Sequence, residues 1–466
     1  MSIKNDIPQK QRALVLQGGG ALGAYEAGAI SVLCQFLSDE DKRKNENQRN
    51  GRLFDIIAGS SIGAMNAAVL VSNVVNREKS WKEAAEILEH FWTDEAKGDE
   101  KKGGLSSTPD ISKWLVDEQK KPKNFNASPE AVRKYYSVKE YVMSRGAPNV
   151  YPPPTLECDS KFADPGNRWL VHDSSPLQNT IERYSQDRKD ENNAKMRIAT
   201  SWDNREPRLL VISVNVAEGK TEAFDSYHTN AEEDPKNSLY EGNGIIIDHV
   251  MASGTLPEFY KFREIPPEGG RKFCDGGILS NTPFRELLRA HRDYWKRAVG
   301  EDKDKIPDLD VYIINVHPSK QDEVPTDLDG VRDRINDITF SDRNSYNDEM
   351  VADLISDYTE LIDRLKELAK SHFANRDESN TIFQNEFENL LNSTEAKSKG
   401  DRGEHIKYKD LLKGRFKLTK VIRIEPAIYS NSIFGKGGDF TSKTITSLIE
   451  QGKQDTRRVL GVQEKT

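Results

Sequence analysis

Two short apolar stretches near the N-terminus are each followed by a glycine-containing turn and a helix-like run. Residues 13–17, ALVLQ, lead into GGGALGAYEAG at 18–28. Residues 53–59, LFDIIAG, lead through a second turn into the small-residue run at 65–75. Parallel strands need a crossover connection, usually a helix, so a repeated strand, turn and helix is typical of them. The repeat predicts an α/β fold with parallel strands and crossover helices.

Further elements are expected downstream. The apolar patterns predict two strands within 208–226 and single strands at 309–316 and 420–426. Residues 351–368 predict an amphipathic helix, since their apolar side chains recur at three- and four-residue spacing. These are Val351, Leu354, Ile355, Tyr358, Leu361, Ile362, Leu365 and Leu368. The polar face of this helix is acidic rather than basic, which favours packing on the protein over lying on a membrane surface.

Polar segments suggest how the chain is organised. Residues 97–160 contain KGDEKKGG and PPP, and residues 374–404 are also polar. Such stretches are typical of exposed loops, and we expect the first to form an inserted lid or cap. A second polar insertion covers residues 320–405, and the sequence does not indicate what it contributes to function. We expect a main domain at 11–320 and a helical, loop-rich C-terminal extension at 321–466 that packs on the core.

Composition excludes several classes of protein. The net charge is −8 and the pI is near 5.7, which argues against nucleic acid as a partner. Three dispersed cysteines, Cys34, Cys158 and Cys274, exclude a disulfide scaffold and a cysteine-rich zinc module. No apolar run approaches the ~20 residues that span a bilayer, and no secretion signal precedes residue 13. We therefore expect a cytoplasmic protein, with peripheral attachment to a membrane left open.

The turn after the second strand carries a G-x-S-x-G pattern, Gly59-Ser60-Ser61-Ile62-Gly63. A serine on a sharp turn between strand and helix has a strained backbone, and its neighbours must be glycine to avoid collisions. The hydroxyl of Ser61 would then project above the sheet at a helix N-terminus, as a nucleophile requires. A plain glycine–serine turn would have the same letters.

The first glycine turn, Gly18-Gly19-Gly20, suits an oxyanion hole, because adjacent backbone N–H groups can point at developing negative charge. The same residues with Gly23 also satisfy the dinucleotide fingerprint G-x-G-x-x-G. That alternative requires a carboxylate at the end of the next strand to hold a ribose. The next strand ends in Ala58-Gly59, so nucleotide binding is disfavoured.

Asp275-Gly276-Gly277 is the third candidate motif. A serine nucleophile needs a base, and a carboxylate can serve directly when burial raises its pKa or a tight contact holds it against the hydroxyl. An ordinary turn is the simpler interpretation of D-G-G. His317 offers a triad alternative, since Ser61, Asp275 and His317 follow the chain order of Ser-Asp-His hydrolases.

GGGALGAYEAG, GSSIG and DGG, in this order, resemble the motifs of the patatin-like phospholipases, as do ASGTLPEFY at 252–260 and LSNTP at 279–283. The resemblance covers about 11–283. It implies a three-layer α/β/α sandwich with a central, mostly parallel sheet. It also implies a catalytic domain with Ser61 as nucleophile, Asp275 as base and the amides of the 18–20 loop as oxyanion hole.

The implied reaction is hydrolysis of a glycerolipid acyl ester through an acyl-serine intermediate, of phospholipase A or lysophospholipase type, with no metal or other cofactor. The expected partner is a lipid or lysolipid substrate. Transfer of the acyl group to an alcohol, or lipid binding without turnover, remain alternatives. One position departs from the family: many members carry Arg or Lys where this chain has Leu22. A side chain that could pair with a lipid phosphate is therefore missing.

Overall fold

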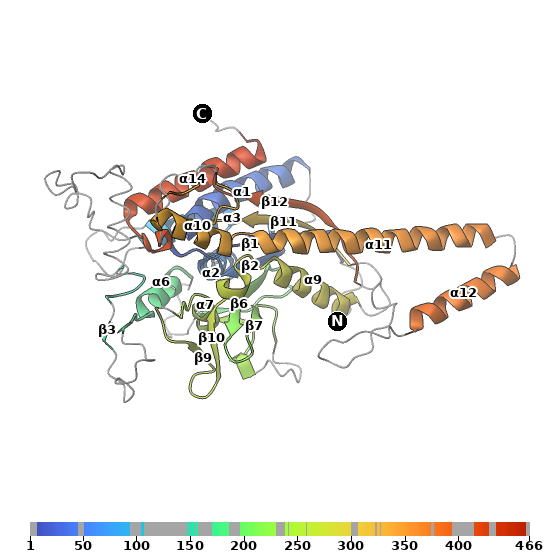
Figure 1. The fold of residues 1–466 in the computed structure, drawn as a ribbon, viewed down its shortest axis with the longest axis horizontal. Helices are drawn as coiled ribbons and strands as arrows, with labels where there is room; N and C mark the ends of the chain where they lie inside the picture. The colour runs from blue at the N-terminus through green and yellow to red at the C-terminus, as the bar shows by residue number, and fades with distance from the viewer. Residues whose placement is uncertain are drawn as a thin grey trace. The chain divides into compact units, whose positions relative to one another are not determined.

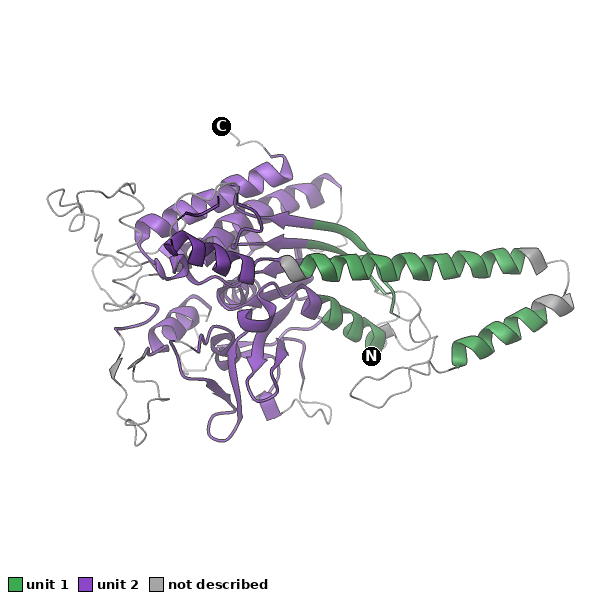
Figure 2. Ribbon diagram, in the orientation of Figure 1, with its two compact units in different colours: residues 1–11, 288–311, 344–421 green, residues 12–287, 312–343, 422–466 purple. Residues whose placement is uncertain are grey.

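The computed structural model shows two compact units (Figure 2). The larger unit consists of residues 12–287, 312–343 and 422–466, and the smaller of 1–11, 288–311 and 344–421. Within these limits the structure describes residues 7–44, 51–93, 104–106, 147, 149–153, 155–156, 170–185, 196–229, 238–240, 242–257, 259–299, 306–321, 324–326, 328–373, 377–393, 414–427 and 435–462. Most of the expected lid at 97–160 lies outside the described residues.

The described residues form an eight-stranded mixed sheet in the order β12-β11-β1-β2-β6-β10-β9, with β7 paired to β6 (Figure 1). The pairs β1–β2 and β2–β6 are parallel, whereas β10 is antiparallel to both β6 and β9. The strands are β1 (Lys10–Leu16), β2 (Ile56–Ser60), β6 (Arg208–Asn215), β7 (Lys220–Asp225), β9 (Arg263–Ile265), β10 (Arg271–Asp275), β11 (Asp308–Ile314) and β12 (Leu418–Ile424).

Two further pairs of two-residue strands lie outside this sheet: β3 (Thr155–Leu156) pairs with β4 (Leu170–Val171), and β5 (Arg197–Ile198) pairs with β8 (Ile245–Ile246). Helices flank the eight-stranded sheet. The helices are α1 (Gly23–Arg43), α2 (Ile62–Val75), α3 (Trp81–Thr93), α6 (Ser175–Ser185), α7 (Ile247–Ser253), α8 (Gly277–Ser280), α9 (Phe284–Val299), α10 (Leu328–Phe340), α11 (Arg343–Phe373), α12 (Asp377–Asn392) and α14 (Ser442–Leu460), with short 3-10 turns η2 (Gly20–Leu22) and η7 (Lys436–Gly438).

The two central strands explain the apolar runs in the sequence. Every residue of β2 and of β6 is buried. Strands of a parallel sheet covered on both faces have this continuous apolar character. In the larger unit, α1 packs along α14 and against α3, and α2 packs on β2 and α3 (Figure 1). The repeated strand, turn and helix of the sequence is confirmed as β1–α1 and β2–α2, and the α/β prediction is confirmed with it.

The sequence predicts no apolar run close to the length of a membrane span, but the segment Gly20–Arg43 is long and apolar enough to cross a membrane. Most of it, 72% of the most apolar window, is buried inside the protein. The side chains of α1 that give the segment its hydropathy therefore contribute to the core, as in the packed helix of an α/β fold.

Two expectations for the C-terminal third are wrong. The helix predicted at 351–368 exists within α11, but its eight apolar side chains are not packed: they are between 37% and 68% exposed. The region 374–404, expected to be loop, contains α12. The periodicity identifies a helix but contains no information about which face the rest of the chain covers.

Candidate functional site

Ser61 stands on a strained turn between β2 and α2. Its backbone has φ 53° and ψ −125°, a region that residues with a side chain seldom occupy. A Cβ on Gly63 would lie 2.6 Å from the carbonyl oxygen of Leu16, and one on Gly59 would collide with the backbone of Gly63. Only glycine fits at these two positions, and the turn has the geometry that the G-x-S-x-G pattern requires.

Ser61 and Asp275 are brought together from positions 214 residues apart. The Ser61 Oγ donates to Asp275 Oδ2 at 2.6 Å, and the other carboxylate oxygen accepts the N–H of Gly277 at 2.7 Å. Asp275 ends β10 and is only 2% exposed. Burial raises its pKa to about 6, against the opposing effect of the hydrogen bonds from Ser61 and Gly277. The carboxylate is thus a far stronger base than an exposed aspartate.

The end of α7 joins the two turns that carry this pair. The Ser253 Oγ accepts the N–H of Ser61 at 2.9 Å and donates to the Ile212 carbonyl at 2.5 Å. The Ser253 carbonyl accepts the N–H of Gly276, and the Thr255 carbonyl accepts the N–H of Asp275 at 2.9 Å. One short segment therefore fixes the backbone on both sides of the Ser61–Asp275 hydrogen bond.

The glycine loop lies against Ser61. A Cβ on Gly18 would be 2.9 Å from the Cβ of Ser61. The N–H of Gly18 donates to the Asn281 carbonyl at 3.2 Å, so this amide is already engaged. Among the described backbone hydrogen bonds, the amides of Gly19 and Gly20 have no acceptor. Of the three glycines proposed for an oxyanion hole, these two have N–H groups available for a developing negative charge.

Gln17 fixes the loop from its N-terminal side. Its backbone N–H donates to the Glu26 carboxylate at 2.8 Å, and its side-chain oxygen accepts the N–H groups of Val316 and His317. Glu26 is fully buried, and Asn66 donates to its second oxygen at 2.8 Å. Burial raises the pKa of Glu26 well above the usual range, against the opposing hydrogen bonds. This buried network positions the start of the glycine loop.

His317 lies on the far side of the same loop. Its Nδ1 is 3.0 Å from Asp337 Oδ1, and its Nε2 would lie 3.5 Å from a Cβ on Gly19. Lys436 contributes its Nζ to Asp337 at 2.8 Å and to Asp333 at 3.2 Å. Both oxygens of Asp275 are occupied by other donors, and no described hydrogen bond joins His317 to Ser61. The geometry does not fit the triad alternative.

Other histidines bond to backbone carbonyls, as a structural role requires. His172 Nδ1 is 3.0 Å from the Pro152 carbonyl oxygen, and His249 Nε2 is 2.9 Å from that of Leu239. Burial lowers the pKa of His249 to about 4. Within the part of the chain that the structure describes, no group of three His, Cys, Asp or Glu side chains could hold a metal ion.

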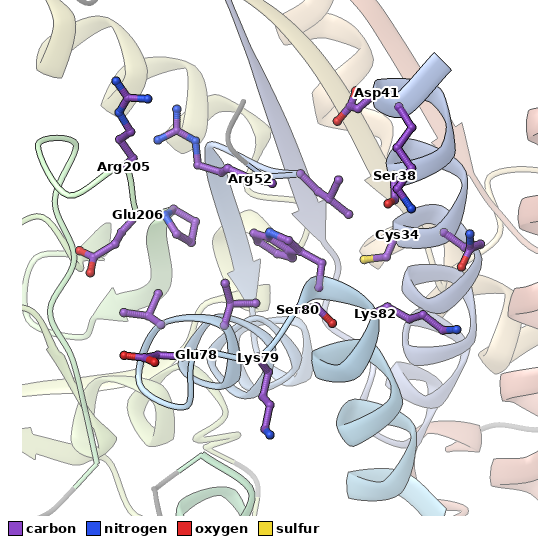
Figure 3. A pocket seen from close by; sticks show the side chains of 18 residues that line it. Cys34, Ser38, Asp41, Arg52, Glu78, Lys79, Ser80, Lys82, Arg205 and Glu206 are labelled. Atoms are coloured by element: carbon purple, nitrogen blue, oxygen red, sulfur yellow. The ribbon is translucent and has the colours of Figure 1, made fainter. Parts of the chain in front are cut away.

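A hollow of about 1140 Å³ is lined by residues 51–53, which precede β2, whereas Ser61 follows β2. Figure 3 shows the side chains that line it. It is bordered by the C-terminal half of α1, the residues that precede β2 and the end of α2. Charged side chains of both signs surround it, including Arg52, Arg205, Glu78 and Glu206. It contains none of the residues near Ser61 and is separate from the candidate active site.

The structure brings together all three sequence motifs: Ser61, Asp275 and the 18–20 loop. It also gives a role to four residues that lie within quoted sequence segments but were not named there as site residues, namely Gln17, Glu26, Ser253 and Asn281. Among these, Glu26 has a signal in the sequence, because it is the one carboxylate in the mostly apolar run 23–37, and a carboxylate buried in such a run must be paired or protonated. The others act through contacts between distant segments, which no local pattern encodes.

A strained serine elbow paired with a buried aspartate on an α/β sheet defines a class of serine hydrolase. The family model of the patatin-like phospholipases matches residues 14–288. The chain belongs to the patatin-like phospholipase family, whose general activity is lipid acyl hydrolysis.

Comparison with curated proteins found no match. Among solved structures, VipD from Legionella pneumophila is similar at 12% identity and a TM-score of 0.32, over 97% of this chain and 67% of that one.

Proposed function

We propose that this protein is a serine acyl hydrolase that cleaves acyl esters of glycerolipids, of phospholipase A or lysophospholipase type. The observation that carries the proposal is the 2.6 Å hydrogen bond from the Ser61 Oγ to the buried Asp275. A neutral serine is a weak nucleophile and needs a base within hydrogen-bond reach. Asp275, whose pKa is raised to about 6, is such a base at neutral pH.

In the proposed reaction, the Ser61 Oγ attacks the ester carbonyl carbon as Asp275 takes its proton. The carbonyl oxygen becomes an oxyanion that accepts from the N–H groups of Gly19 and Gly20. The intermediate then collapses to an acyl-serine, and the departing alcohol takes the proton from Asp275. Water repeats the sequence on the acyl-serine, releases the fatty acid and restores Ser61. Every proton passes through Asp275, and no metal takes part in these steps.

Exposed apolar side chains near the pair support a lipid substrate. Leu256, Ile278 and Leu279 are 38%, 48% and 43% exposed. Leu256 follows Thr255, which bonds to the Asp275 backbone, and the other two lie on α8 directly after the D-G-G turn. Isolated exposed leucines are ordinary, but several beside one polar pair favour an acyl chain or a lipid surface as partner.

Helix α10 adds to this surface. Its acidic residues Asp333 and Asp337 face inward, while Ile335 and Ile338 are 58% and 43% exposed. The carbonyl of Phe340 at its end accepts from Asn281, which in turn bonds to the glycine loop. We propose that this side of the larger unit meets the lipid phase from the cytoplasm as a peripheral surface.

Hydrolysis of p-nitrophenyl esters of graded chain length tests the proposal. Ser61→Ala should reduce turnover by ~10³-fold or more, because the nucleophile is lost. Ser60→Ala is a matched control, since it removes the adjacent buried hydroxyl and should retain turnover. A fluorophosphonate probe should label the parent and the control but not Ser61→Ala. Undiminished turnover in a folded Ser61→Ala protein would contradict the proposal.

Product analysis separates hydrolysis from acyl transfer, because water and alcohols react with the same acyl-serine. Added lysolipid or glycerol should leave free fatty acid as the main product; a new acylated lipid would identify a transferase. The side chain of Leu22 is buried rather than offering a cation for a phosphate. Comparing phosphatidylcholine with neutral glycerides then defines the preferred substrate.

A further inference from the structure

Within the smaller unit, α11 presents its polar face to the rest of the unit and its apolar face to solvent, the reverse of the usual arrangement of an amphipathic helix. Its polar face makes the intramolecular contacts: Asp363 pairs with Arg415, and Glu360 pairs with Lys417 at 2.6 Å. Thr359, on the same face, is 7% exposed. Since these contacts occupy the polar face, the apolar face is left to solvent.

The exposed apolar residues repeat at alternating spacings of three and four. The series is Val351, Leu354, Tyr358, Leu361, Leu365 and Leu368, with exposures between 51% and 68%. This is the a and d pattern of a coiled coil, in which two helices meet along one seam. It spans 18 residues, about two and a half heptads, and so makes a short seam. The pattern indicates that another helix packs on this face.

The charges beside the seam disfavour a membrane as the occupant. Between residues 351 and 368 there are five acidic side chains, Asp353, Asp357, Glu360, Asp363 and Glu367. The same span has two basic ones, Arg364 and Lys366. Helices that lie on membranes carry a basic polar face, because it is attracted to anionic lipids. An acidic helix with heptad spacing fits a protein partner better.

We infer that this face of α11 pairs with the same face of a second copy of the chain, in antiparallel orientation. The stripe is complementary to itself when the helix is reversed about its midpoint between Tyr358 and Leu361. Each a residue then meets a d residue of the second copy, in the layers Val351–Leu368, Leu354–Leu365 and Tyr358–Leu361.

The charges flanking the seam specify this orientation. Asp357 and Arg364 both occupy the g position of the heptad, and both are exposed. In the antiparallel register, Asp357 faces Arg364 of the second copy, and the twofold symmetry produces this pair twice. In a parallel pair, Asp357 would face Ile362 and Arg364 would face Ala369, so neither would gain a charge partner on the second copy, and Arg364 would keep only its pair with Glu360 on its own helix. Charges at the e and g positions set partner and orientation in coiled coils.

Analytical ultracentrifugation of the full chain, over a range of concentrations, tests this inference. The parent should sediment as a dimer. Leu361→Asp should raise the dissociation constant by ~100-fold or more, because a charge enters the seam twice. Circular dichroism should show that the helix content of this variant is retained.

Charge exchange tests the register. Asp357→Arg and Arg364→Asp should each raise the dissociation constant by ~10-fold, because each places like charges together twice. The double variant should return to the parent value. Asp353→Arg is the matched control: it makes the same charge change on the same helix outside the seam, and should leave the constant within about twofold.

Three results would overturn the inference. The first is a monomer at every concentration. The second is a dimer that Leu361→Asp does not weaken, or a double charge variant no tighter than the singles. The third is a monomeric parent that binds phosphatidylcholine vesicles and loses that binding on Leu361→Asp, which would assign the stripe to a lipid surface.

Discussion

Two buried aspartates in the larger unit differ in the charge of their partners. Asp275 bonds to a serine hydroxyl and a backbone N–H, both neutral. Asp337 bonds to His317 and to the cation of Lys436. Burial raises the pKa of Asp275 to about 6. Burial also acts to raise the pKa of Asp337, but the bond from His317 and the charge of Lys436 outweigh it, and that pKa is lowered.

The comparison shows that partners, rather than burial alone, decide what a buried carboxylate can do. A carboxylate bonded only to neutral donors stays poised to take a proton near neutral pH. One held by a cation remains a fixed anion and serves to position its neighbours. The region around Asp275 is therefore suited to chemistry, whereas that around Asp337 is suited to supporting the glycine loop.

Replacing each aspartate by asparagine should give the largest difference between the two residues, measured as loss of ester turnover. Asp275→Asn should reduce ester turnover by ~10³-fold, because the amide cannot accept the serine proton. Asp337→Asn should reduce it by no more than ~10-fold, because only the support of the loop is altered. Turnover measured on both variants, after circular dichroism confirms folding, checks this. Similar losses in the two would show that the aspartates do not differ in role.

The same two variants should change the free energy of unfolding in opposite directions at pH 8. The folded pKa of Asp275 lies above its unfolded value, so stability is gained as pH falls through 6 and lost as it rises. Asp275→Asn should therefore raise the free energy of unfolding by about 2 kcal/mol at pH 8 and by less at pH 5.

Asp337→Asn should lower that free energy by about 3 kcal/mol at pH 8, because it leaves Lys436 and His317 without their shared anion. The folded pKa of Asp337 lies below its unfolded value, so this contribution is lost as pH falls through the folded pKa. Urea unfolding at the two pH values measures both changes. A destabilised Asp275→Asn at pH 8 would contradict the raised pKa.

Turnover of the parent should depend on pH through Asp275. The base must be deprotonated, so kcat/KM should rise about tenfold between pH 5 and pH 7 and then level off. His317→Ala should keep this profile, because the pKa of His317, lowered by burial, does not belong to the reacting pair. A pH–rate profile of both proteins is the measurement, and loss of the inflection in His317→Ala would restore the triad alternative.

The smallest effect is expected from Lys436. Lys436→Met removes the cation from Asp337 while retaining the length of the side chain, and should lower kcat by ~3-fold with little change in KM. Lys443→Met, at an exposed lysine on α14, is the control and should have no effect. Steady-state kinetics of the two variants and the parent test this. If Lys436→Met has the same kcat as Lys443→Met, Lys436 has no positioning role.

Sequence predicts the parts of this site that depend on local chemistry. Apolar runs predict β1, β2 and β6, because a strand buried on both faces consists almost entirely of apolar residues. Gly59, Ser61 and Gly63 are predictable because the elbow tolerates no other spacing. Asp275 is predictable through its glycines.

The supporting contacts are not predictable in this way. Ser253 reaches Ser61 across 192 residues, and Lys436 reaches Asp337 across 99. Ser253 lies within the family-like segment 252–260, but that segment does not show which group its hydroxyl contacts, and Lys436 has no local signature because lysine is common on surfaces. The heptad spacing of α11 has the opposite limitation: its period is clear, but the orientation of the helix depends on Arg415 and Lys417, which lie in another part of the chain.

The contact between the two ends of the larger unit has a consequence for biosynthesis. Gly437 packs against Gly20, and the neighbouring Lys436 completes the ion pairs behind the glycine loop. More than 400 residues separate them. At roughly 5–20 residues per second, the ribosome needs tens of seconds to add the intervening chain. A nascent chain would thus carry Ser61 and Asp275 without a finished glycine loop until residues 436–437 have been added.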